Sequence, residues 1–252
     1  MGWLKNRRLS KSAAVYIPIG ALLIVLLTVL GTSGFFRVVE VEVGGSAIYT
    51  EDEIIGISGI EYGDNLLFVD TNAAARRIQG AMPFINSAKV TRHPPGSVRI
   101  EVTESVAIAW VAFESEALII DSSGRVLQRT FYAPTDLVEV LGFRASEAVE
   151  GSVLKPELGN ETTFQFLLDV IMAIEREGIQ DGVSYLDVTS FSNINFGYAE
   201  RFRVILGGPT NLRQKLTSLS NAIANVDAGD LAGSTGTFKA ETDGSWRFVP
   251  DN

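Results

Sequence analysis

Residues 13–30 read AAVYIPIGALLIVLLTVL and contain no charged side chain. An α-helix of about 18–20 apolar residues spans about 27–30 Å, which matches the hydrocarbon core of a bilayer. A lone segment that crosses lipid must be helical, because its backbone has to satisfy its own hydrogen bonds. We therefore expect a transmembrane helix over residues 13–33. Its anchoring side chains would include Ala13, Ile17, Leu22, Leu26 and Leu30.

The charges that flank this stretch predict its orientation. Four basic residues precede it without any acidic neighbour, namely Lys5, Arg7, Arg8 and Lys11. The first charge after it is Arg37. The positive-inside rule then keeps residues 1–12 in the cytoplasm as a basic tail and exports the chain from Phe35 onward. The sequence thus predicts a single-pass type II protein of the inner or plasma membrane.

The same stretch has two alternative interpretations. A cleaved secretory signal has a shorter apolar core of about 7–15 residues and an Ala-x-Ala-like exit, whereas the exit here is Thr32-Ser33-Gly34. Arg7-Arg8 would suit a twin-arginine signal, but Leu9-Ser10-Lys11 does not continue that pattern. An uncleaved anchor is favoured over both.

Composition limits what the exported part does. The 252-residue chain has a net charge of −9, and its tail carries four of the positive charges, so the remainder is near −13. Such an acidic surface argues against nucleic acid as a ligand. The chain has no cysteine, which excludes disulfides, thiol catalysis and Cys-ligated metals.

Residues 35–104 predict a small α+β domain. An alternating, β-branched run from Phe35 to Val43 predicts a strand, and Thr50 with Glu53 forms the capping box of a short helix. Asp70 or Thr71 is expected to cap a second helix that runs to about Gly80. Two strands follow, at 85–93 and 98–104, joined by a Pro-Pro-Gly turn. The order is β-α-α-β-β.

Residues 105–252 predict a second, mixed β domain with helices. Strands are expected at 108–113, 117–120, 125–128, 137–141, 183–188 and 202–206. Helices are expected at 161–177, where Asn160 would cap, and after a Thr210 cap. The second helix carries one apolar stripe, made of Leu212, Leu216, Leu219, Ile223 and Val226. Core packing is favoured for this stripe over a partner coiled coil, because it lasts barely two heptads.

The C-terminal residues predict a β-hairpin. Asp243-Gly244 separates two alternating runs, 237–242 and 245–249. Alternation places Phe238, Ala240, Trp246 and Phe248 on one face and Lys239, Glu241 and Arg247 on the other.

Four segments, taken in order, resemble a known family. They are Phe36-x-Val38-x-x-Val41-x-Val43-x-Gly45, Gly63-x-Asn65-Leu66-Leu67-x-Val69-Asp70, Pro83-x-Ile85-x-x-Ala88-x-Val90-x-Arg92-x-Pro94 and Val98-x-Ile100-x-Val102-x-Glu104. With the preceding anchor they resemble the FtsQ/DivIB family of bacterial cell-division proteins. Ile119-Ile120-Asp121-x-x-Gly124-x-Val126-Leu127 is similar to the strand and turn ahead of the family's β domain. The Glu-Arg-x-Pro-x-Ala junction of the family is replaced by Glu104-Ser105-Val106-Ala107.

The resemblance implies a POTRA domain at 35–104, a β domain at 105–252 and a non-enzymatic scaffold of the division septum. It implies protein partners, namely FtsB (DivIC in Gram-positive bacteria), FtsL and the septal transpeptidase, and a part in regulating septal peptidoglycan synthesis. It implies no cofactor, metal, nucleic acid or small-molecule substrate.

The residues themselves offer little catalytic chemistry. His93 is the only histidine and lies before Pro94-Pro95, without a Gly-x-Ser-x-Gly elbow elsewhere. Asp227, Asp230 and Asp243 lack the spacing of a calcium loop. We therefore expect no catalytic, cofactor or metal residues.

Three hypotheses remain open at this level. The favoured one is a binding scaffold whose terminal hairpin accepts a partner strand by β-addition. Its partner-binding residues would be Phe238, Lys239, Glu241, Trp246, Arg247 and Phe248. The aromatic rings among them could equally close the domain's own core. The alternatives are a POTRA chaperone for exported polypeptides and an anchored cell-wall enzyme or sugar binder.

Overall fold

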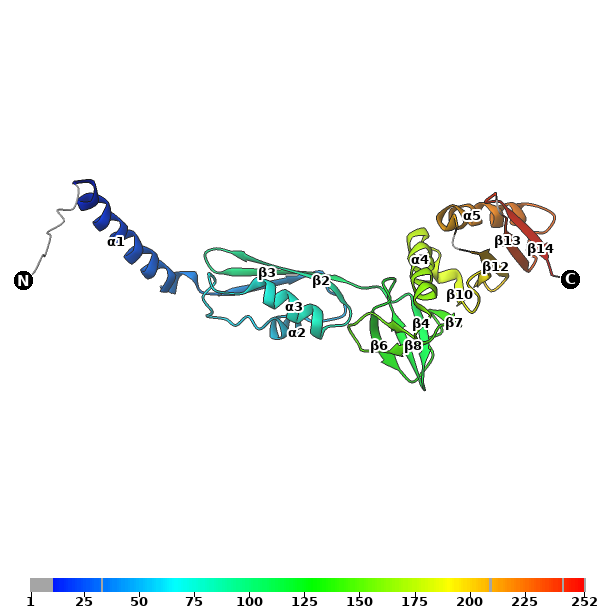
Figure 1. Ribbon diagram of the computed structural model, residues 1–252, viewed down its shortest axis with the longest axis horizontal. Coiled ribbons are helices and arrows are strands. Elements are labelled where there is room, and N and C mark those ends of the chain that lie inside the picture. The colour runs from blue at the N-terminus through cyan, green and yellow to red at the C-terminus, as the bar shows by residue number, and fades with distance from the viewer. Residues whose placement is uncertain (1–10, 33, 209, 242, 252) are drawn as a thin grey trace, which may run out of the picture. The chain divides into compact units, whose positions relative to one another are not determined.

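The computed structural model describes residues 11–251 apart from 33, 209 and 242 (Figure 1). The chain divides into two compact units. The first comprises Met1–Gln79 and Ser87–Thr103, and the second comprises Gly80–Asn86 and Glu104–Asn252. Residues 1–10 of the expected basic tail lie outside the described residues.

The first helix, α1 (Lys11–Thr32), includes the apolar stretch and contains Pro18. Its described side chains are exposed, Ile17, Leu22 and Leu26 among them. The side chains of Ala13 and Leu30 lie outside the described residues. Over the described part of the chain, no helix combines the length and the hydropathy that a membrane crossing requires.

The rest of the first unit packs two helices on a three-stranded sheet. The elements are β1 (Glu40–Gly44), α2 (Glu51–Ser58), α3 (Thr71–Ala81), β2 (Ile85–His93) and β3 (Ser97–Glu104). The sheet order is β1-β3-β2, with β1 parallel to β3. The expected order β-α-α-β-β is confirmed.

The first strand begins later than predicted. Residues 34–36 form a 3-10 turn, η1 (Gly34–Phe36), and β1 starts only at Glu40. The intervening backbone pairs with a loop rather than with the sheet. Val38 N–H donates to Asp64 O and Leu66 N–H to Phe36 O, both at 2.8 Å.

Local signals place the two helices as the sequence predicts. Thr50 and Glu53 form the capping box of α2. Asp70 caps α3, since its Oδ1 accepts from Ala73 N–H at 2.9 Å. The apolar side chains of this unit that are wholly buried are chiefly Ile54, Leu66, Ala74, Ile78, Val98 and Ile100.

The second unit is built on a nine-stranded sheet of order β14-β13-β12-β11-β10-β7-β4-β5-β6. Its strands are β4 (Ala109–Phe113), β5 (Glu116–Ile120), β6 (Val126–Thr130), β7 (Val138–Leu141), β10 (Val183–Asp187), β11 (Ile194–Tyr198), β12 (Phe202–Gly207), β13 (Gly236–Ala240) and β14 (Trp246–Pro250). A separate pair, β8 (Ala145–Glu147) and β9 (Lys155–Pro156), and the turn η2 (Gln180–Gly182) complete it with α4 (Glu161–Glu177) and α5 (Leu212–Ala228).

The apolar stripe of α5 packs into the core of this unit, which confirms the prediction against a coiled coil. Leu216 and Leu219 are 1% exposed, and the other three members pack against the same cluster. Lys215 is also buried, and its Nζ donates to Leu206 O at 2.7 Å and to Gly208 O at 3.2 Å. The helix is thereby fastened to the end of β12.

One predicted cap is wrong. Helix α5 follows Asn211, which has φ 58° and makes no side-chain capping bond, so Thr210 is not the cap. Asn160 is the N-cap residue of α4 as predicted, although its side chain makes no capping bond. Its carbonyl accepts the first bond of the helix, from Phe164 N–H.

Candidate partner-binding edge

The predicted hairpin is confirmed as β13 and β14. Asp243 Oδ1 accepts from Ser245 N–H at 2.9 Å and from Ser245 Oγ at 2.6 Å, and Gly244 has φ 84°. The bonds from the Ser245 hydroxyl and N–H lower the pKa of Asp243. The turn therefore holds its register through an ionised side chain.

Strand β14 lies at one border of the nine-stranded sheet, where β13 is its only neighbour among the strands described. Glu241 N–H donates to Ser245 O at 2.9 Å and Asp251 N–H to Thr235 O at 3.1 Å, in the same antiparallel register. Because inward and outward residues alternate in such a ladder, Trp246 and Phe248 direct their N–H and C=O groups away from β13. Pro250 adds an outward C=O but has no N–H.

The aromatic residues of the hairpin share one face, as alternation predicts. Phe238 pairs across the strands with Phe248, with ring centroids 4.8 Å apart, and Trp246 lies 6.4 Å from Phe238. Their exposure differs, since Phe238 is 1% exposed while Trp246 and Phe248 are half-buried. Phe238 thus belongs to the core, and the other two rings reach the surface.

The opposite face of the hairpin is charged. Arg247 Nη2 lies 2.5 Å from Glu241 Oε1, and Lys239 is the exposed cross-strand neighbour of Arg247. The six predicted partner-binding residues therefore lie on one hairpin but on two faces.

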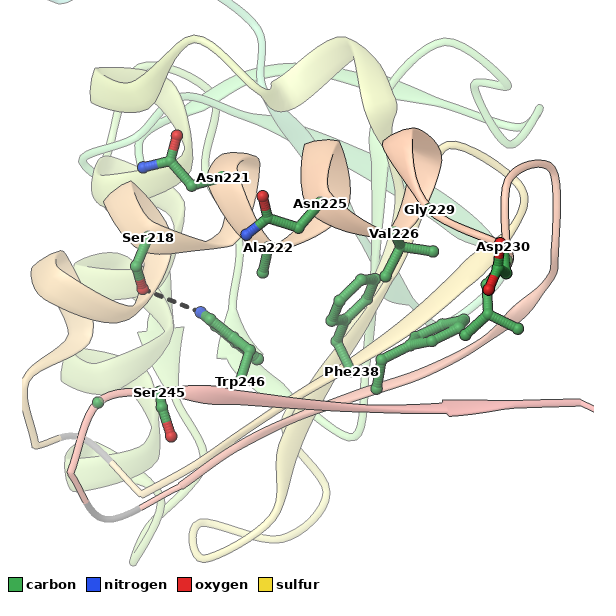
Figure 2. Close-up of a pocket in the computed structure, with 13 residues that line it drawn as sticks. Ser218, Asn221, Ala222, Asn225, Val226, Gly229, Asp230, Phe238, Ser245 and Trp246 are labelled. Atoms are coloured by element: carbon green, nitrogen blue, oxygen red, sulfur yellow. Dashed lines mark hydrogen bonds between the residues drawn. The ribbon is translucent and has the colours of Figure 1, made fainter.

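A groove of about 800 Å³ runs between α5 and the aromatic face of the hairpin. Figure 2 shows Trp246 rising from β14 toward α5, where its Nε1 donates to Ser218 Oγ at 3.0 Å. Lys215 O accepts from the same Nε1 at 3.2 Å. The lining residues are Ser218, Asn221, Ala222, Asn225, Val226, Gly229, Asp230, Leu231, Phe238, Gly244, Ser245, Trp246 and Phe248.

Sequence reasoning missed the α5 side of this groove. Ser218, Asn221 and Asn225 follow a helical spacing beside the apolar stripe, a signal that would have marked a polar face next to the core. Leu231, which follows α5 in the chain, also lines the groove and is 41% exposed.

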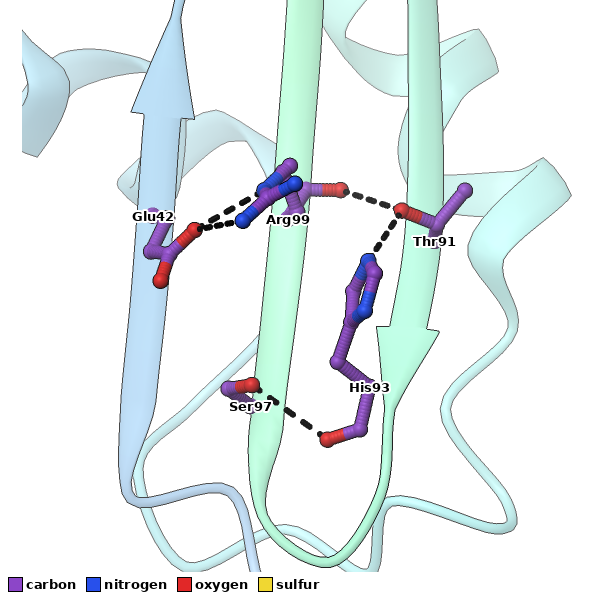
Figure 3. A network of polar contacts seen from close by, with 5 residues as sticks. All are labelled: Glu42, Thr91, His93, Ser97 and Arg99. Carbon is purple, nitrogen blue, oxygen red and sulfur yellow. Dashed lines mark hydrogen bonds and ion pairs between the residues drawn. The ribbon is translucent and has the colours of Figure 1, made fainter.

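His93 lies in the first unit, away from any catalytic arrangement (Figure 3). Its Nε2 is 3.1 Å from Thr91 Oγ1, and Thr91 Oγ1 also lies 3.5 Å from Arg99 O. Arg99 pairs with Glu42 at 2.7 Å across β1 and β3. In the part of the chain that the structure covers, no three His, Asp or Glu side chains come together to hold a metal.

Comparison with known proteins gives a consistent result. Residues 36–105 match the family described as "POTRA domain, FtsQ-type". "Cell division protein FtsQ" of Anaeromyxobacter sp. is 30% identical over 89% of this chain and 77% of its own length. "Cell division protein DivIB" of Clostridium botulinum (strain Hall) is 24% identical over 87% of this chain and 83% of its own.

One solved structure is also similar, the major extracytoplasmic domain of the cell-division protein DivIB from Geobacillus stearothermophilus. It covers 51% of this chain and 96% of its own at 16% identity, with a TM-score of 0.32. A score that low does not bear on the fold of this chain.

Proposed function

The chain belongs to the FtsQ/DivIB family of bacterial cell-division proteins, and from that premise we propose that it is a membrane-anchored scaffold of the division complex. In this proposal residues 35–104 are the POTRA domain and residues 105–252 are the β domain that binds the partner. The protein acts at the septum without an enzymatic activity of its own. Its relatives carry cell-division names, which supports a part in division.

We propose that residues 13–33 anchor the protein in the inner or plasma membrane. Helix α1 covers Lys11–Thr32, and the described side chains of residues 15–29 are exposed and mostly apolar. Lipid is the environment in which such a surface is stable. The basic residues before it support a cytoplasmic N-terminus and an exported remainder.

The partner would add a strand to β14. The outward edge offers two N–H and three C=O groups, at Trp246, Phe248 and Pro250. Five hydrogen bonds at about 1 kcal/mol each would contribute about 5 kcal/mol. Association costs an estimated 4–15 kcal/mol, so the backbone ladder alone does not hold a partner.

The remaining affinity would come from side chains of the hairpin and the groove. Trp246 and Phe248 are half-buried rings next to the groove of about 800 Å³, a setting typical of binding hot spots. On the charged face of the hairpin, Lys239, Glu241 and Arg247 would favour a partner whose side chains carry the complementary charges. Phe238, which is buried, would support the rings from below rather than touch the partner. The partner proteins we propose are FtsB or DivIC, with FtsL and the septal transpeptidase in the same complex.

A pair of substitutions at one position tests the β14 edge. Phe248→Ala removes the ring but keeps the outward N–H, whereas Phe248→Pro removes both and leaves the β13 ladder intact. We expect Phe248→Pro to bind an FtsB or DivIC ectodomain several-fold more weakly than Phe248→Ala, measured by titration calorimetry on the full chain in detergent.

Equal affinity of the two variants would contradict strand addition at this edge. The circular dichroism spectra of both variants should match that of the unaltered chain, because Phe248 is only half-buried. An assay for peptidoglycan hydrolysis by the same preparation tests the enzymatic alternative, and turnover would contradict the scaffold proposal.

A further inference from the structure

Large apolar side chains are exposed on the part of the first unit that follows α1. Phe35 is 66% exposed, Tyr62 64%, Leu67 42% and Phe68 77%. They come from two separate stretches of sequence, the η1 turn and the loop before α3. Exposed apolar residues scattered singly are ordinary, whereas apolar side chains that gather in one place point to a contact surface.

Backbone hydrogen bonds hold these two stretches together. Leu66 N–H donates to Phe36 O at 2.8 Å, and Gly63 N–H donates to Val38 O at 2.8 Å. Phe68 N–H closes the turn on Asn65 O at 2.9 Å. Tyr62, Leu67 and Phe68 therefore lie within one or two residues of positions that are bonded directly to the chain leaving α1.

The distance from this group to the end of α1 is short. Phe36 follows Thr32 by four residues, and an extended chain spans at most about 3.3–3.6 Å per residue, so about 14 Å separate them at most. The loop bonded to Phe36 is limited in the same way. If α1 ends at the bilayer surface, these side chains lie at headgroup depth.

Two arginines accompany the rings. Arg92 donates to Val69 O from Nε at 3.0 Å and from Nη2 at 2.6 Å, yet the residue is exposed. Arg37 is exposed beside Phe36. Two neighbouring carboxylates accept hydrogen bonds from the backbone. Asp64 Oδ2 accepts from Glu61 N–H, and Asp70 caps α3. Arginine beside aromatic rings suits the phosphate level of a membrane interface.

We propose that Phe35, Tyr62, Leu67 and Phe68 form a membrane-contacting surface, which seats the first unit in the lipid interface next to its anchor. The inference rests on the proposed membrane anchor. Its occupant is the headgroup and upper acyl region of the bilayer, because the covalent link to α1 keeps this surface beside that region whatever else the protein binds.

The absence of cysteine makes the test direct. Single variants Phe68→Cys and Phe131→Cys would be spin-labelled on the full chain in nanodiscs of phosphatidylcholine with a minority of phosphatidylglycerol. Phe131 is the matched control, because it is the same residue type, is 76% exposed against 77% for Phe68, and lies in the second unit. A third label at Leu22 reports on the anchor.

The measurement is the collision rate of each label with a water-soluble nickel complex and with oxygen. We expect the nickel rate at position 68 to be several-fold lower than at position 131, with a higher oxygen rate. Equal nickel rates at the two positions would overturn the inference. Leu67→Cys provides a second label on the same turn, and it should show the same protection as position 68.

The label at Leu22 separates two kinds of failure. Lipid exposure at position 22 with full water exposure at position 68 would refute the membrane-contacting surface and leave the anchor standing. Water exposure at both positions would refute the anchor itself, and the surface with it.

Discussion

Trp246 links the two sides of the candidate site at the scale of a single residue. Its indole N–H donates to Ser218 Oγ and Lys215 O on α5, while its ring lies half-buried at the mouth of the groove. The same side chain thus contributes to folding and, in the proposed function, would also contact a partner. Substitutions have to separate these two contributions.

Trp246→Phe and Trp246→Ala provide that separation. Trp246→Phe keeps an aromatic ring and loses the N–H donor, so we expect a loss of about 1 kcal/mol of unfolding free energy. Trp246→Ala removes most of the side chain, and we expect about 2–3 kcal/mol together with a several-fold loss of partner affinity. Thermal unfolding and titration calorimetry on the full chain measure both. Unchanged affinity of folded Trp246→Ala would remove Trp246 from the binding site.

Asp70 makes the stability of the first unit depend on pH. The bond from Ala73 N–H lowers the pKa of its carboxyl. A folded pKa below the ordinary value of about 3.9 means that the stabilisation is present above that value and is lost as pH falls through the folded pKa. As pH falls below about 4, we expect Asp70→Asn to lose less unfolding free energy than the unaltered chain, measured by chemical denaturation. If the unfolding free energy of the variant fell with decreasing pH as steeply as that of the unaltered chain, this role of Asp70 would be contradicted.

Alternation predicted which face each hairpin side chain occupies but not how deeply it is buried. Phe238 and Phe248 follow the same pattern, yet only Phe238 is buried. Strand β13 lies between β12 and β14, and the rings of Phe202 and Phe248 pack on Phe238, whereas β14 lies at the border of the sheet. Burial is therefore decided by neighbours from elsewhere in the chain. A single strand carries no signal for it.

Elements with clear start and stop signals in the sequence were predicted best. Helix α4 begins at Glu161 and ends at Glu177 as expected, because Gly178 adopts φ 67° after a regular apolar stripe. Strand β11 was missed, since Asn195 and Gly197 weaken its β signal. A Cβ at Gly197 would approach Ser184 Oγ to 2.5 Å and Tyr185 Cε1 to 2.6 Å, so a larger residue there would have to displace both side chains. This strand forms because of tertiary packing, and the local sequence pattern alone does not predict it.

Lys215 fastens α5 to the sheet, and its removal tests that attachment. Lys215→Met keeps the length of the side chain but leaves the carbonyls of Leu206 and Gly208 without their donor. We expect a loss of about 1–3 kcal/mol of unfolding free energy. Lys239→Met, at an exposed position of β13, is the control and should cost less than about 0.5 kcal/mol. Equal effects would show that the buried ammonium does not secure the helix.

The order of the nine strands is a property of the whole second unit. Strand β7 lies parallel between β4 and β10, and β12 pairs in parallel with β13. Such pairings join segments far apart in sequence, so hydrophobic pattern and turn residues did not reveal them. The β-α-α-β-β order of the first unit could be predicted because each element carries its own local signal, but the parallel pairing of β1 with β3 was not predicted.

The proposed orientation in the membrane is also a property of the whole molecule. Replacing Lys5, Arg7, Arg8 and Lys11 with Gln removes the charge asymmetry across residues 13–30. We expect a larger share of molecules with the C-terminus retained inside, measured by protease protection of the β domain in spheroplasts. Four Gln substitutions at basic residues after residue 105 are the control and should leave the topology unchanged. An unaltered topology in the first variant would contradict orientation by the tail.

Pro250 has a consequence for how molecules of this protein treat one another. A bare sheet border invites identical borders to pair and to grow into fibres, and proteins discourage this by keeping such borders brief and interrupted. On β14 the outward donors end at Phe248, because Pro250 supplies none. If β14 accepts a guest strand as we propose, the missing donor at Pro250 would leave room for one such strand and would discourage polymers of the protein with itself.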